Sequence, residues 1–122
     1  MVDALVALHD TEELRAFLPQ GERIRQAVAV LGPAIDRATG LLHHWEGDTT
    51  GARPSLERAL AAYERLGNPF EAARTREYLA EALPEDERAA LLDAALRQYE
   101  HLGATPYAGR VRLRLQELVH RV

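Results

Sequence analysis

The sequence predicts an all-α fold built from stacked antiparallel helix pairs, and three observations lead to this prediction. First, the segment ALAAYERLGNPFEAAR at 59–74 returns 36 residues later as ALRQYEHLGATPYAGR at 95–110. Second, each copy carries an apolar stripe at helical period. Third, glycine and then proline follow each stripe, as at the end of one helix and the start of the next. A repeat of this length is typical of helix pairs that bury their apolar faces against neighbouring pairs.

The N-terminal third carries the weakest form of this pattern. A short apolar helix is expected over 2–8, and Asp10 with Glu13 resembles a capping box that opens a helix over 11–18. A faint third copy of the repeat includes Pro19 and Val28 and ends at Leu31-Gly32-Pro33. The next helix is expected over 33–46, followed by a turn at Gly47-Asp48. Its apolar residues at helical spacing are Ile35, Ala38, Leu42 and Trp45.

The two clear copies each contain the second helix of a pair. The stripe of the first copy comprises Leu56, Ala59, Leu60, Tyr63 and Leu66, and that of the second comprises Leu92, Ala95, Leu96, Tyr99 and Leu102. Gly67 and Gly103 are predicted to end these helices in the left-handed conformation. Pro69 and Pro106 are predicted to lie in the first turn of the next helix.

The remaining elements complete the pattern. A helix over 69–83 carries the apolar residues Phe70, Ala73, Tyr78, Leu79 and Ala82. Pro84-Glu85-Asp86-Glu87 then begins a helix with proline and acids in its first turn. The last segment, 105–121, contains VRLRL, which alternates as a strand would. Its apolar side nevertheless continues at helical period, so a helix is predicted; that side comprises Val111, Leu115, Leu118, Val119 and Val122.

At this point the chain resembles the tetratricopeptide repeat family. Gly40, Gly47-Asp48, Ala52 and Ala59 stand at the spacing of that repeat, in which small residues let the two helices approach closely. The resemblance implies one domain, 1–122, forming a right-handed superhelical stack of about seven to eight helices. Its units would be approximately 1–32, 33–68 and 69–104, with a terminal helix at 105–122. The sequence of the repeats resembles that of the repeat arms of large bacterial ATP-binding regulators, including LuxR-type activators and cyclase-linked ATPases.

Composition narrows the possible functions. The net charge of −4 lacks the basic excess of a general nucleic-acid-binding protein. Cysteine is absent and all 15 basic residues are arginine, which removes thiol nucleophiles, a phosphate-loop lysine and Schiff-base chemistry. The first ten residues have an acid at position 3 and no basic region before the apolar stretch, so we expect no signal peptide and a cytoplasmic protein without membrane contact.

Neither a catalytic nor a metal site is expected. The adjacent His43 and His44 point about 100° apart on a helix, so they cannot chelate one ion together. Asp48 has the spacing to join His44, but a helix-capping role explains it better. Ser55 is the single serine, lies just after Pro54 near an expected helix start, and lacks the GxSxG motif of a nucleophile. We therefore expect no enzyme and no cofactor, and keep catalysis only as a formal alternative.

One set of side chains suggests binding. Arg37, Arg74 and Arg110 recur at spacings of 37 and 36 in successive first helices. The resemblance implies that these helices line a concave surface, where guanidinium groups suit carboxylates or phosphates. The predicted partner-binding residues are Arg37, His44, Arg74, Arg110 and Arg114, against the alternative of an ordinary solvated polar face.

The function expected is that of a protein-interaction module that binds a peptide or partner domain, with acidic partners among the candidates, as an arm of a larger bacterial regulator. The alternative is a purely architectural segment whose ends pair with each other or with further repeats. The apolar residues of the terminal helix, with Leu113 apart from its main stripe, predict a two-fold homodimer of the isolated chain.

Overall fold

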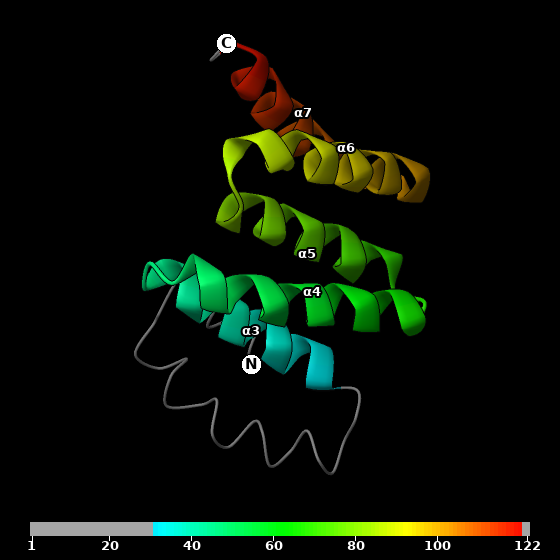
Figure 1. The fold of residues 1–122 in the computed structure, drawn as a ribbon. Helices are drawn as coiled ribbons and strands as arrows, with labels where there is room; N and C mark the ends of the chain where they lie inside the picture. Colours follow the sequence, from blue (N-terminus) through cyan, green and yellow to red (C-terminus); the bar gives the residue numbers. More distant parts are fainter. Residues whose placement is uncertain (1–30, 121–122) are drawn as a thin grey trace. The chain divides into compact units, whose positions relative to one another are not determined.

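The computed structural model describes residues 31–120, and every element in this part of the chain is helical (Figure 1). The five helices are α3 (Gly32–Trp45), α4 (Thr49–Arg65), α5 (Pro69–Ala82), α6 (Glu85–Leu102) and α7 (Thr105–His120). The all-α prediction is confirmed for these residues, which contain no strand, and VRLRL lies inside α7. Seven to eight helices are not found within them. The helices expected at 2–8 and 11–18, with the Asp10–Glu13 capping box and the faint repeat residues Pro19 and Val28, lie outside the described residues, as does Val122.

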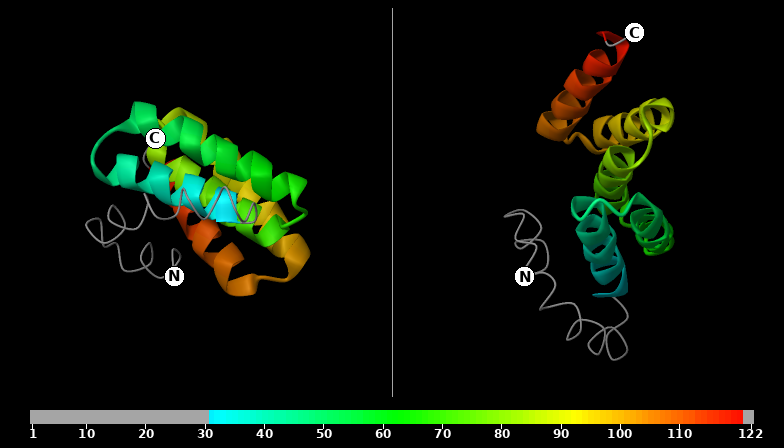
Figure 2. Two further views of the ribbon diagram at one scale, coloured as in Figure 1. Left: turned by 90° about the horizontal axis from the view of Figure 1, so that it is seen from below. Right: turned by 60° about the vertical axis from the view of Figure 1, so that its left-hand side comes forward.

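The chain forms two compact units, Met1–Ala62 and Tyr63–Val122, with the division inside α4. Residues 31–62 of the first unit and 63–120 of the second are described. In the first unit, α3 and α4 run in opposite directions, and in the second the chain reverses after α5 and again after α6 (Figures 1 and 2). No helix among residues 31–120 is long and apolar enough to cross a membrane.

Glycine and proline end and begin the helices largely as the sequence indicates. Gly47, Gly67 and Gly103 have φ values of 85°, 67° and 72°, the left-handed conformation in which glycine avoids the strain of a Cβ atom. Pro69 is the first residue of α5, and Pro106 is the second residue of α7. Gly32 differs: it is the first residue of α3, and Pro33 is the second.

The start of α4 corrects one expectation. The helix begins at Thr49 and contains Pro54, rather than starting near Pro54. The Asp48 carboxylate accepts a hydrogen bond from the Gly51 amide at 2.9 Å, which confirms Asp48 as the cap. Pro54 has no amide hydrogen, so the intrahelical hydrogen bond to the carbonyl of Thr50 is not formed.

Close contact between α3 and α4 depends on small residues. A Cβ atom on Gly40 would lie 2.6 Å from Cγ of Leu56 and 3.1 Å from the carbonyl oxygen of Ala52. Ala52 and Ala59 are both fully buried. The expectation of a small residue in the first helix facing alanines in the second is therefore met by the geometry of this pair.

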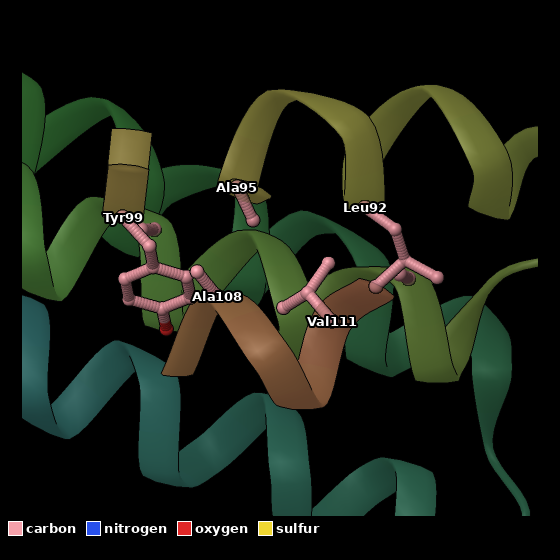
Figure 3. Packing of buried hydrophobic residues seen from close by; sticks show 7 residues of the cluster. Leu92, Ala95, Tyr99, Ala108 and Val111 are labelled. Atoms are coloured by element: carbon pink, nitrogen blue, oxygen red, sulfur yellow. The ribbon is translucent and has the colours of Figure 1, made fainter. Parts of the chain in front are cut away.

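The core of the second unit lies between α6 and its neighbours α5 and α7. Leu92, Ala95 and Tyr99 of α6 face Ala108 and Val111 of α7 (Figure 3). Val111 is 0% exposed, and complete burial of a side chain of this size contributes about 1.5–3 kcal/mol. This core accounts for the apolar stripes of α6 and α7 that the sequence shows.

Three apolar residues assigned to these stripes are exposed instead. Leu66 and Leu102 come ten residues after the first member of their stripes, which places them about 80° away from it at helical pitch. Their exposed fractions are 57% and 41%. Val119, near the end of α7, is 71% exposed, whereas Leu115 and Leu118 pack partly against the core. Leu113, expected to lie apart from the stripe, is 62% exposed.

Candidate interaction site

A buried carboxylate on α5 forms the centre of the candidate site. Glu77 is only 4% exposed, and its neighbours one turn away, Ala73 and Ala80, belong to the apolar core. A charged side chain therefore lies on a face that is otherwise apolar. A buried carboxylate is costly unless hydrogen bonds and opposite charges compensate it. In the described part of the chain, every buried polar side-chain atom does have a partner.

The partners of Glu77 come from both neighbouring helices. Tyr99 of α6 donates its hydroxyl hydrogen to Oε2 of Glu77. Arg110 of α7 donates from Nε to Oε1 at 3.2 Å and from an Nη to Oε2 at 2.8 Å, a two-pronged contact that suits a carboxylate. Arg114, one turn further along α7, has an Nη 3.6 Å from Oε1. One buried acid thus links the three helices of the second unit.

The network shifts the pKa values of Tyr99 and Arg110. Burial, together with the hydrogen bond to Glu77 and its negative charge, raises the pKa of the Tyr99 hydroxyl well above its ordinary value. The hydrogen bond to Glu77 raises the pKa of the Arg110 guanidinium, against the opposing effect of desolvation. The Tyr99 hydroxyl therefore stays protonated and donates its hydrogen to Glu77.

Aromatic rings pack beneath this network. The rings of Phe70 and Tyr99 meet edge to face with centroids 5.8 Å apart, and those of Phe70 and Tyr107 do so at 4.9 Å. The Arg110 guanidinium lies over the Tyr107 ring, 4.9 Å from its centroid. Stacking on a ring and two hydrogen bonds to Glu77 hold this guanidinium in one place, although its side chain is 52% exposed.

A cavity of about 250 Å³ opens beside the network, between α5 and α7. It is lined by Arg74, Glu77, Tyr78, Glu81, Arg110 and Arg114. Arg74 is held by its own helix: it donates to the Tyr78 hydroxyl at 2.8 Å and lies 3.8 Å from the Glu71 carboxylate. Three guanidinium groups and two carboxylates leave the lining with one net positive charge.

The structure brings together three of the five residues predicted to bind a partner. Arg74, Arg110 and Arg114 line this one cavity of the second unit. Arg37 and His44 lie on α3 in the first unit, where Arg37 is 2% exposed and His44 is half-buried. The histidine paired with Asp48 is His43, whose Nδ1 is 3.2 Å from Oδ2. Among residues 31–120, no group of three or more potential ligands is arranged to hold a metal ion.

Sequence reasoning missed Glu77 and Glu81, the acids that pair with Arg110 and Arg114. A signal for Glu77 exists in the repeat, because it stands 36 residues after Leu41. Glu77 thus stands where the other copy has a buried leucine, and it lies between two alanines of an apolar face. A glutamate at such a position is expected to be buried and to need a positively charged or hydrogen-bonding partner. Glu81 carries no such signal, because exposed glutamates also occur on α4, α6 and α7.

Comparison of the chain with models of protein families, with curated proteins and with solved structures gave no match.

Proposed function

We propose that this chain is a protein-interaction module of tetratricopeptide-like helix pairs that binds an acidic peptide or partner domain at the cavity between α5 and α7. The finer architecture proposed is a right-handed superhelical stack of seven to eight helices. The setting proposed is the arm of a larger bacterial regulator in the cytoplasm, in a role without catalysis. The 36-residue repeat and the close contact of α3 with α4 at Gly40 support this architecture.

The observation that carries the proposal is the convergence of Arg74, Arg110 and Arg114 on one cavity. Arginine forks bind carboxylates through paired hydrogen bonds, and groups already held in place lose little conformational freedom on binding. The single net positive charge of the lining matches one carboxylate better than a dianionic phosphate. An aspartate or glutamate of a partner protein supplies such a group.

Binding of a fluorescent hexaglutamate peptide tests the proposal. The affinity is expected to fall as salt rises, and Arg74→Glu is expected to weaken binding about tenfold or more, since hydrogen bonds to charged groups are lost. The melting temperature should change little, because the polar contacts of Arg74 described above are to its own helix.

The matched control is Arg97→Glu. Arg97 lies on α6 outside the cavity lining, is 79% exposed and pairs with Asp93 on its own helix. The reversal changes the net charge by the same amount as Arg74→Glu. Equal losses of affinity in the two variants would show that binding depends only on the net charge of the chain, and the cavity would then not be the binding site.

A second candidate function is architectural, and the exposure of Leu113 and Val119 on α7 favours it. Exposed apolar side chains on one helix are a common feature of contacts between chains. In this role the isolated chain forms a two-fold dimer, as expected from the sequence. Sedimentation at tens of micromolar is expected to show a dimer that Leu113→Asp converts into a monomer, whereas a monomeric parent would remove this candidate.

A further inference from the structure

Two carboxylates on α5 share one guanidinium on α7. Glu77 and Glu81 lie one helical turn apart, and each has an oxygen 3.6 Å from a different Nη atom of Arg114. All three residues line the cavity. Their surroundings differ sharply, because the side chain of Glu77 is 5% exposed and that of Glu81 is 48% exposed.

Glu77 is fixed and Glu81 is not. Glu77 accepts hydrogen bonds from Tyr99 and Arg110 in addition to its pairing with Arg114. The contact of Glu81 with Arg114 is longer than a hydrogen bond and half-exposed, and pairs of this kind are weak. Rotation of its side chain would return the Glu81 carboxylate to water at little cost.

We infer that Glu81 is an internal competitor for the acidic ligand: its carboxylate neutralises Arg114 in the free protein and gives way when a partner's carboxylate enters the cavity. This inference rests on the function proposed above. Like charges around one guanidinium repel each other, so a third carboxylate displaces the neighbour that is held least. Glu77 stays in place and keeps Arg110 oriented.

The consequence is a penalty on every ligand that must reach Arg114. A carboxylate that reaches this guanidinium gains only the difference between its own contact and that of Glu81. Ligands that contact only Arg74 or Arg110 escape this penalty. Glu81 thus lowers the affinity of the cavity for carboxylates that bind at Arg114.

Titration of the full chain with fluorescent hexaglutamate tests the inference. Glu81→Gln keeps the size of the side chain and removes the competing charge. It is expected to bind the peptide about twofold to fivefold more tightly than the parent, the range that corresponds to an exposed ion pair. In an Arg114→Gln background the same substitution should change the affinity much less, because the contested guanidinium is gone; thermal melts verify that both backgrounds are folded.

The matched control is Asp93→Asn. The side chain of Asp93 is also 48% exposed and pairs with an arginine, but it lies outside the cavity lining. Equal tightening by Asp93→Asn and Glu81→Gln would overturn the inference in favour of a general charge effect. Unchanged affinity in Glu81→Gln, with a parent that binds, would overturn the inference alone. Absence of binding by the parent and all variants would overturn the proposed function as well.

Discussion

Leu41 in the first unit and Glu77 in the second occupy the same place in the repeat, 36 residues apart, and both are buried. The first unit fills the place with an apolar side chain, whereas the second fills it with a carboxylate. Tyr99 and Arg110, which hold that carboxylate, stand at the repeat positions of Tyr63 and Arg74. At this place in the repeat the first unit thus buries a leucine, whereas the second buries a carboxylate with a polar network built around it.

The most severe test of this comparison transfers the acid to the first unit. Leu41→Glu is expected to destabilise the fold by about 3–5 kcal/mol, because a carboxylate would be buried at a fully buried site without the partners built around Glu77. Leu41→Met is the volume-conserving control and should cost less than about 1.5 kcal/mol. Urea unfolding measures both. A small cost for Leu41→Glu would show that the first unit supplies equivalent partners.

The reverse exchange in the second unit should be milder. Glu77→Leu is expected to cost about 1–3 kcal/mol, since the buried Tyr99 hydroxyl loses its acceptor while Arg110 can still be hydrated. Adding Tyr99→Phe should restore part of this loss, because both polar partners are then apolar. A double-mutant cycle by urea unfolding gives the coupling energy. Strictly additive effects would contradict the network.

The packing alanines should behave alike in both copies. Ala59 and Ala95 are each 0% exposed, so Ala59→Leu and Ala95→Leu should each overpack a helix pair and cost about 1–3 kcal/mol. Ala61→Leu and Ala89→Leu, on the exposed sides of α4 and α6, should change stability by no more than about 0.5 kcal/mol. Thermal melts compare the four variants, and coincident curves would refute the shared packing.

Alkaline pH should weaken the second unit through Tyr99. Because burial and Glu77 raise the pKa of its hydroxyl above the ordinary 10.0, this contribution to stability is fully present below that pH and is lost as the pH rises further. The free energy of unfolding should fall by about 1.4 kcal/mol for each pH unit above that value. Urea unfolding of the parent and of Tyr99→Phe at several pH values checks this, since the variant should show a shallower fall.

The turn glycines give the smallest expected effect. Gly67→Ala and Gly103→Ala should each cost about 1–2 kcal/mol, because both residues have a left-handed backbone and nothing lies within 4 Å of an added Cβ. Gly109→Ala, at an open helical position, should instead stabilise by about 0.5–1 kcal/mol. Melting temperatures that move in the same direction for all three would contradict the turn geometry.

Sequence patterns predicted the helices better than the site. Glycine and proline mark helix ends through backbone geometry, so the helices expected at 69–83 and 105–121 agree with α5 and α7 within one residue. The predicted start of the helix near Pro54 was wrong, because in a sequence a proline just after the first turn resembles a proline in the first turn. Periodicity indicates which face of a helix is apolar, but it does not say which charge on that face is buried. For this reason Arg74, Arg110 and Arg114 were singled out while Glu77 was not.

The order of contacts along the chain also bears on how the second unit folds. Its apolar core joins helices that follow each other directly, and the contacts of Glu77 with Tyr99 and Arg110 span 22 and 33 residues. Domains whose contacts are this local in sequence fold in roughly microseconds to milliseconds. The pairing of α5 with α6 can form as soon as both helices exist, whereas the Glu77–Arg110 contact must wait for α7. We therefore expect substitutions at Arg110 to accelerate unfolding and to leave the folding rate nearly unchanged.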